Sequence, residues 1–196
     1  MVEWLNAIAS IITLFIIAAS AVAAVIGLRH AEANNGLKAL LLIEQEFRSQ
    51  AVQEALRYVQ ADLPERLEHA PYRGELVELG FIDPIGHPEV TACNWFDEMG
   101  SVVKNRMVGE DPFMDLFGRM LGHYWTLLSP AIALMRRRRG QSQYHNFEYV
   151  AIRARAWTVK HPNGIFPRGT ARTALRDPWL AIDNSTPTPS LTGTLP

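Results

Sequence analysis

An uncharged apolar run near the start of the chain, from Leu5 to Leu28, limits the folds open to it more than any other feature. A bilayer core takes about 20 apolar residues in helical form, and this run is long enough to cross it. Because unpaired backbone groups are not tolerated in hydrocarbon, a segment of this kind must be a helix. We therefore predict a transmembrane helix, with residues 1–30 as a membrane anchor.

A cleaved signal peptide is the alternative interpretation of this run. Such a peptide begins with a positively charged segment and has a shorter apolar stretch, whereas Glu3 is the sole charged side chain before the run. The anchor interpretation is therefore favoured. The predicted anchor residues are Trp4, Leu5, Phe15, Leu28 and Arg29.

The cations that flank the run predict its orientation. The N-terminal flank has no Lys or Arg, whereas the C-terminal flank carries Arg29 and Lys38. Positive residues stay on the cytoplasmic side of a membrane, and aromatic residues such as Trp4 mark its interfaces. We expect a single-pass protein with its N-terminus outside and the rest of the chain in the cytoplasm.

The chain after the anchor predicts a helical domain over residues 31–160. Asn34-Asn35-Gly36 predicts a break after the span. Apolar residues at steps of three and four predict helices over 37–61, 72–79, 88–106, 111–138 and 146–159. Sustained alternation, the signature of strands, is missing from the sequence. The predicted fold class is therefore all-α: one transmembrane helix, then an irregular bundle of about four or five helices.

Several helix boundaries have specific signals. Pro88 is predicted at the first position of its helix, and Asp111 is predicted to cap the next one with Pro112 in the first turn. Asn146 is predicted to cap the last helix, and Pro130 to kink or split the one before it. The predicted buried faces are Val90, Cys93, Phe96, Met99 and Val103; Phe113, Phe117, Met120, Tyr124 and Leu127; and Phe147, Val150, Ala154 and Trp157.

Residues 161–196 differ in character from the domain. They hold six of the 12 prolines and few apolar residues, so they bury little surface to offset the entropy of ordering. We expect an extended proline-rich tail that lies along a partner. Its predicted partner-binding residues are Phe166, Trp179, Pro187 and Pro189.

The net charge of −1 conceals an asymmetry along the chain. Residues 32–115 hold 16 acidic and 7 basic side chains, whereas residues 116–196 hold 11 basic and 3 acidic ones. Such a division is typical of chains that use one part against a charged surface. Attraction between the two parts within the fold explains it equally well.

Catalytic and metal motifs are missing from the sequence. The single cysteine, Cys93, lies in an apolar stretch and is expected to be buried. The histidines lack the spacing of a zinc pair, so we expect no metal and no cofactor. An enzyme that uses Glu98 or Glu148 with His145 is a minor alternative, because carboxylates on charged helix faces are usually solvated or paired.

The arginine run, Arg136, Arg137, Arg138 and Arg139, is the sharpest local feature. Four guanidinium groups must lie at a surface, and cations at the end of a helix suit its dipole. Binding to anionic lipid headgroups or to an acidic protein partner are the functional alternatives. Nucleic acid is not expected, because no aromatic residues are interleaved with the run.

Three short segments carry a resemblance. They are 94–98 (Asn-Trp-Phe-Asp-Glu), a predicted helix with Trp125 and Pro130, and 144–148 (Tyr-His-Asn-Phe-Glu). In that order, over about residues 1–160, the chain resembles an uncharacterised bacterial family of membrane-anchored helical proteins, domain of unknown function 4760. The resemblance implies an all-α fold and a bacterial inner-membrane location. It implies no activity and no catalytic residues.

Together these features favour a non-enzymatic accessory or scaffold subunit of a larger bacterial membrane protein complex, such as an energy-transducing one. The alternative is a sensor or regulator at the membrane surface that binds anionic lipid through the arginine run.

Overall fold

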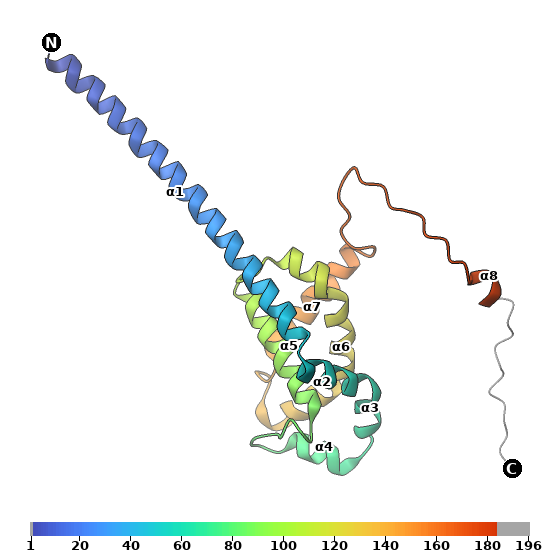
Figure 1. Cartoon of the computed structure of the whole chain (residues 1–196). Coiled ribbons are helices and arrows are strands. Elements are labelled where there is room, and N and C mark those ends of the chain that lie inside the picture. The colour runs from blue at the N-terminus through green and yellow to red at the C-terminus, as the bar shows by residue number, and fades with distance from the viewer. Residues whose placement is uncertain (1, 184–196) are drawn as a thin grey trace, which may run out of the picture. The chain divides into compact units, whose positions relative to one another are not determined.

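The structure, a computed structural model, describes residues 2–183, without the side chains of residues 2, 3, 5–12, 32, 33, 181 and 183. The chain divides into two units, Met1–Gly164 and Ile165–Pro196. The described residues contain helices and no strand, so the predicted all-α class is confirmed (Figure 1). The helices are α1 (Val2–Phe47), α2 (Gln50–Ala61), α3 (Leu63–Arg66), α4 (Ala70–Val77), α5 (Pro88–Lys104), α6 (Glu110–Arg139), α7 (His145–Lys160) and α8 (Leu180–Asp183).

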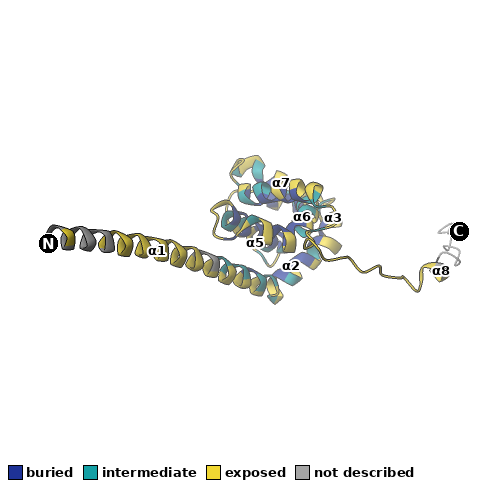
Figure 2. Cartoon of the chain, turned by 90° about the horizontal axis from the view of Figure 1, so that it is seen from above, coloured by how far each residue is buried: buried dark blue, intermediate teal, exposed yellow. Residues whose placement is uncertain are grey.

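Helix α1 is long and apolar enough to cross a membrane. An 18-residue window of its segment Thr13–Phe47 has a mean hydropathy of 1.9, and none of that window is buried. Figure 2 shows this exposure along the helix, which gives way to partial burial only in its last turns. Among the predicted anchor residues, Trp4, Phe15, Leu28 and Arg29 are exposed, and the side chain of Leu5 lies outside the described residues.

The predicted break at Asn34-Asn35-Gly36 is wrong, because α1 continues through it to Phe47. A glycine within a helix costs only about 1 kcal/mol, which packing can outweigh. Ile43 is buried in the core, and Leu40 and Phe47 pack against it. These contacts stabilise the turns that follow Gly36.

The predicted continuous helix over 37–61 is also wrong, because the chain turns at Arg48–Ser49. The Ser49 hydroxyl accepts a hydrogen bond from the Val52 amide at 3.4 Å and caps α2. The Gln53 side chain donates to the Phe47 carbonyl at 2.7 Å and satisfies the end of α1. Two polar side chains thus pair the backbone groups that a helix break leaves open.

The core of the first unit lies among α5, α6 and α7, with α2 against α5 and α4 against α6. The three predicted faces lie in this core, and only Met120 and Leu127 are partly exposed. Phe96 of α5 stacks on Phe147 of α7, with ring centroids 4.6 Å apart. Burial of each such ring contributes roughly 1.5–3 kcal/mol.

Helices α5 and α7 meet at a close backbone contact. A Cβ on Gly100 would lie 2.1 Å from the Asn146 carbonyl oxygen, so only glycine fits there. The predicted Asn146 cap is wrong, because α7 begins one residue earlier and Tyr144 adopts a left-handed φ of 55°. Instead, the Asp97 carboxylate accepts hydrogen bonds from the amides of Asn146 (2.9 Å) and Phe147 (3.0 Å). The cap of α7 therefore comes from another helix.

Helix α6 begins at Glu110 after Gly109, so the predicted cap at Asp111 is wrong. Pro112 is still tolerated, because the first amides of a helix need no intrahelical partner. Pro130 lies inside the helix and does not split it.

The second unit is extended from Ile165 until α8 and is largely exposed. The Arg172 guanidinium lies 4.7 Å from the centre of the Phe166 ring, and Trp179 is exposed. Pro187 and Pro189 lie outside the described residues.

Candidate functional site

The connector between α4 and α5, residues 78–87, exposes large apolar side chains and is a candidate interaction surface of the first unit. We name it the distal connector. The Arg139 guanidinium at the end of α6 donates to the carbonyls of Glu78 (2.5 Å) and Gly80 (2.9 Å). Gly80 has a φ of +131°, a backbone conformation that side chains disfavour. The start of this connector is therefore fixed by a residue about 60 positions later in the sequence.

The distal connector exposes large apolar side chains. Phe81 and Ile85 are each 89% exposed, and Leu79 is also exposed. The Asp83 carboxylate accepts a hydrogen bond from the Ile85 amide at 3.1 Å, which holds the turn between them. Ordered loops that present clustered apolar side chains to solvent are typical of interaction sites.

A polar network closes the base of the distal connector. The two ring nitrogens of His87 lie 2.9 Å from Glu89 Oε1 and 2.8 Å from Glu75 Oε2. The Tyr72 hydroxyl donates to Glu89 Oε1 at 2.6 Å and lies 3.0 Å from the Tyr58 hydroxyl. Helices α2, α4 and α5 each supply members, so the network joins three elements.

The His87 ring lies between two carboxylates and meets one of their oxygens at each ring nitrogen. His87 and Glu89 are both buried, whereas the side chain of Glu75 is exposed. The network therefore reaches from the core of the domain to its surface.

Burial also affects the pKa of the Tyr72 phenol. Desolvation, followed by its hydrogen bond to Glu89, raises the pKa of Tyr72 far above its ordinary value. Glu89 Oε2 is buried and has no hydrogen-bond partner among the described residues. A cavity of about 330 Å³ adjoins the network and is lined by Glu75, His87 and the distal connector.

The arginine run divides into two pairs. Arg136 turns inward, forms an ion pair with Glu148 at 2.8 Å, and donates to the Gln143 carbonyl at 2.9 Å. Arg139 holds the distal connector, as described above. Arg137 and Arg138 are exposed and line a cavity of about 390 Å³ together with Arg73. Of the four arginines predicted to bind lipid or a partner, Arg137 and Arg138 are thus the two that are exposed.

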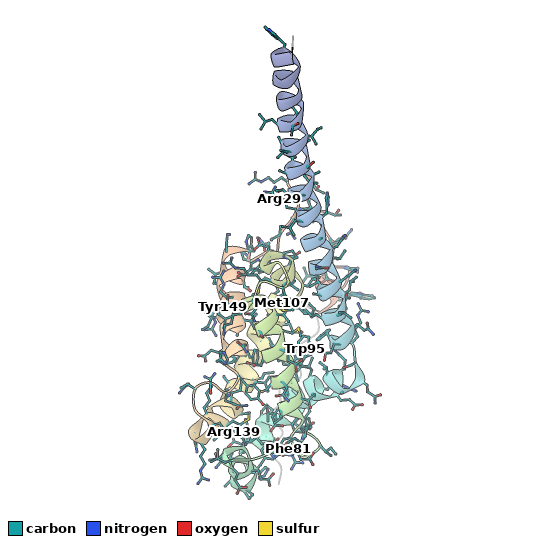
Figure 3. The ribbon with its side chains drawn as sticks, turned by 90° about the vertical axis from the view of Figure 1, so that its left-hand side faces the viewer. Arg29, Phe81, Trp95, Met107, Arg139 and Tyr149 are labelled. Carbon is teal, nitrogen blue, oxygen red and sulfur yellow. The ribbon has the colours of Figure 1, made fainter. Side chains whose placement is uncertain are left out.

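The arginine run lies far from the apolar part of α1. The start of α6 contacts α1, since Gly36, Leu37, Gly109 and Pro112 line one cavity. Helix α6 has 30 residues and is therefore about 45 Å long. Figure 3 shows the same separation, with Arg139 and Phe81 at one end of the domain and Arg29 beyond the other. This geometry separates the run from the membrane that α1 would enter.

Of the candidate catalytic residues, Glu98 is exposed on α5, and Glu148 is paired with Arg136. His145 Nδ1 lies 2.9 Å from the Ser142 carbonyl, and its Nε2 lies 3.2 Å from Lys104 Nζ. Cys93 is buried as predicted, and desolvation raises the pKa of its thiol.

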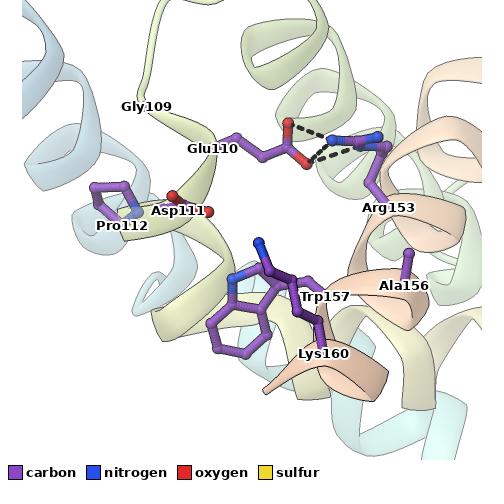
Figure 4. Close-up of a pocket in the computed structure, with 8 residues that line it drawn as sticks. All are labelled: Gly109, Glu110, Asp111, Pro112, Arg153, Ala156, Trp157 and Lys160. Carbon is purple, nitrogen blue, oxygen red and sulfur yellow. Dashed lines mark hydrogen bonds and ion pairs between the residues drawn. The ribbon is translucent and has the colours of Figure 1, made fainter. Parts of the chain in front are cut away.

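A cavity of about 520 Å³ lies between the start of α6 and the end of α7 (Figure 4). Glu110 and Arg153 face each other across it and form an ion pair at 2.7 Å. Asp111 and Lys160 also line it, so its charges balance. The described residues hold no cluster of His, Cys, Asp or Glu arranged for a metal ion.

Neither the His87 network nor the distal connector is predicted from the sequence. His87 and Glu89 flank Pro88, which predicts only the start of a helix. The available signal was the cluster of Leu79, Phe81 and Ile85 among turn residues, because loops are usually polar. The partners Glu75 and Tyr72 lie on a different element, so no local spacing predicts the contacts.

The sequence profile of the family described as Domain of unknown function (DUF4760) matches residues 14–154. No curated protein and no solved structure matches the chain. The matched residues extend from α1 into α7 and so include the distal connector, the His87 network and the arginine run. Because they make up well over half of the chain, this protein belongs to the DUF4760 family.

Proposed function

We propose that this protein is a membrane-anchored, non-catalytic accessory subunit that binds a bacterial membrane protein complex through the distal connector. The observation that carries the proposal is the 89% exposure of Phe81 and Ile85 on a connector that Arg139 and His87 hold in place. The resemblance to bacterial membrane-anchored proteins and the apolar length of α1 support the membrane setting.

The composition of the surface supports a protein partner. Aromatic residues and arginine are enriched where interfaces derive most of their binding energy. Phe81 would act as a central apolar anchor, and burial of a phenylalanine side chain contributes roughly 1.5–3 kcal/mol. Arg137, Arg138 and Arg73 supply cations near the same end of the domain. An acidic rim on the partner would complement them.

The proposed topology places the N-terminus outside and the domain in the cytoplasm. Arg29 follows the apolar run directly, and Lys38 lies further along α1. The tail from Ile165 onward supplies a second, extended contact in this proposal, with Phe166 and Trp179 as its described candidates.

The alternative, a lipid sensor that uses the arginine run, is less well supported. The run lies about 36–41 Å along α6 from Pro112, which lines a cavity with Gly36 and Leu37 of α1. Two of its four arginines are bound to the chain's own carbonyl and carboxylate groups.

Purification of the tagged full chain from its native membrane in mild detergent tests the proposal. We expect a stoichiometric set of membrane proteins to co-purify with the wild type. The amount of co-purified partner should fall at least tenfold with the double variant Phe81→Ala/Ile85→Ala. The control is Ile152→Ala on α7, which removes an isoleucine side chain that is 61% exposed and should retain the partner.

Two results would count against the proposal. Equal recovery of the partner with the double variant and the wild type would remove the distal connector as the interface. A wild-type protein that purifies as a lone monomer or homo-oligomer would remove the accessory-subunit function itself.

A further inference from the structure

A second exposed surface lies at the opposite end of the domain, on the connector between α5 and α6. We name residues 105–109 the proximal connector. A Cβ on Gly36 of α1 would lie 3.9 Å from the Met107 carbonyl oxygen, and Leu37 and Arg106 line a cavity at the same contact. The domain therefore first meets α1 close to Gly36.

This contact lies a short distance from the end of the apolar run. Gly36 follows Leu28 by eight positions in one continuous helix, which corresponds to about 12 Å along its axis. The headgroup layer of one leaflet occupies about 5–8 Å beyond the hydrocarbon. Long side chains on the proximal connector can span the remaining few ångströms, and a tilt of α1 shortens them further.

The proximal connector is held by its own neighbours. Asn105 donates from its side chain to the Ser101 carbonyl at 2.9 Å, and the Met107 amide donates to the Val102 carbonyl at 3.0 Å. Val108 is buried, whereas Met107 is 61% exposed. The Met107 side chain is thus presented by an ordered turn, and Figure 3 shows it in the half of the domain nearer to Arg29.

The side chains around Met107 suit an anionic surface. Arg106, with a left-handed φ of 57°, and Lys38 on α1 are both exposed. Arg29 lies between them and the apolar run. Among the described side chains, the acidic groups nearby are Asp111 and Glu110 at the start of α6, and Glu110 is paired with Arg153. Cations next to an apolar side chain are typical of residues at the membrane interface.

We propose that the proximal connector, through Arg106 and Met107 and together with Lys38, contacts the anionic lipid headgroups of the leaflet from which α1 emerges. This inference rests on the membrane anchoring proposed above. It assigns lipid contact to the proximal end of the domain and leaves the arginine run to a protein partner. The contact would fix the angle between the domain and the membrane, and so the height at which the distal connector meets its partner.

Site-specific fluorescence in vesicles tests the contact. The full chain carrying Met107→Cys is labelled with an environment-sensitive fluorophore and reconstituted into phosphatidylcholine vesicles with and without phosphatidylglycerol. Cys93 is buried, so it stays unlabelled in the folded protein, and the wild-type chain serves as the labelling control. Ile85→Cys, on the distal connector, is the matched label position. The readout is quenching by lipids that carry a spin label on the headgroup.

We expect at least threefold more quenching at position 107 than at position 85 in vesicles with phosphatidylglycerol. Lys38→Gln/Arg106→Gln should remove most of that difference, whereas Arg137→Gln/Arg138→Gln should leave it unchanged. Equal quenching at positions 107 and 85, in protein that floats with the vesicles, would overturn the contact and leave the anchoring intact. Equal quenching at position 107 without phosphatidylglycerol would overturn the anionic headgroup as the ligand. Protein that fails to float with the vesicles would overturn the anchoring, and the contact with it.

Discussion

The two connectors differ in what holds them. The distal connector is held at its start by Arg139 of α6. At its end, His87 pairs with Glu75 of α4. The proximal connector is held by hydrogen bonds between residues at most five positions apart. Both expose apolar side chains, but among the described residues only the distal one is held by hydrogen bonds from distant elements and by titratable side chains. Its conformation should therefore respond to remote substitutions and to pH, whereas that of the proximal connector should not.

Removal of Glu89 should have the largest effect. Glu89→Ala removes the buried acceptor that His87 Nδ1 and the Tyr72 hydroxyl share, which should lower the free energy of unfolding by about 3 kcal/mol. Urea unfolding followed by circular dichroism measures the change. Hydrogen exchange should accelerate in residues 78–87 and stay unchanged in residues 105–109. The exposed Glu68→Ala is the control, and a similar small loss in both variants would refute a special role of Glu89.

Arg139→Gln should have the next largest effect. It removes the two hydrogen bonds to the carbonyls of Glu78 and Gly80, which should lower the free energy of unfolding by about 2 kcal/mol. Arg138→Gln, one residue earlier and exposed, should change it by less than about 0.5 kcal/mol. Thermal unfolding of the two variants compares them. If both shift the midpoint equally, Arg139 does not hold the connector.

High pH should loosen the distal end through Tyr72. Its pKa is raised in the folded state by burial and by the hydrogen bond to Glu89. The phenol therefore contributes stability that is present below the ordinary tyrosine pKa of 10.0 and is lost as the pH rises above it. Ultraviolet titration should show Tyr72 ionising only together with unfolding, and Tyr72→Phe should weaken the pH dependence above that value. If Tyr72 ionised while the helical content was still unchanged, this account would be contradicted.

Substitution at the positive-φ positions should give the smallest effects, of opposite sign at the two connectors. Arg106→Gly relieves a left-handed conformation at φ 57° and should stabilise the fold by up to about 1 kcal/mol. Gly80→Ala forces a side chain onto φ 131° and should destabilise it by about 1 kcal/mol. Urea midpoints measured side by side give both signs. If both substitutions changed the free energy of unfolding in the same direction, backbone strain would not explain their effects.

The sequence determined the elements whose signals are local. An uncharged run of this length leaves only a helix, and apolar residues at steps of three and four place Phe96, Met99 and Phe147 on buried faces. Pro88 begins its helix as predicted, because a proline fixes its own backbone and needs no amide partner. These outcomes depend on periodicity and covalent geometry, which a sequence states directly.

The tertiary structure alone decided where polar groups found their partners. Asn146 has the side chain of a cap, yet Asp97 from α5 caps α7, because Gly100 lets the two backbones approach. Arg136 and Arg138 are alike in sequence, yet one meets Glu148 and the other faces solvent. A hydrogen bond or an ion pair forms between groups that the fold brings within about 3 Å, however far apart they are along the chain. For that reason the partners of His87 and Arg139 follow only from the placement of the helices.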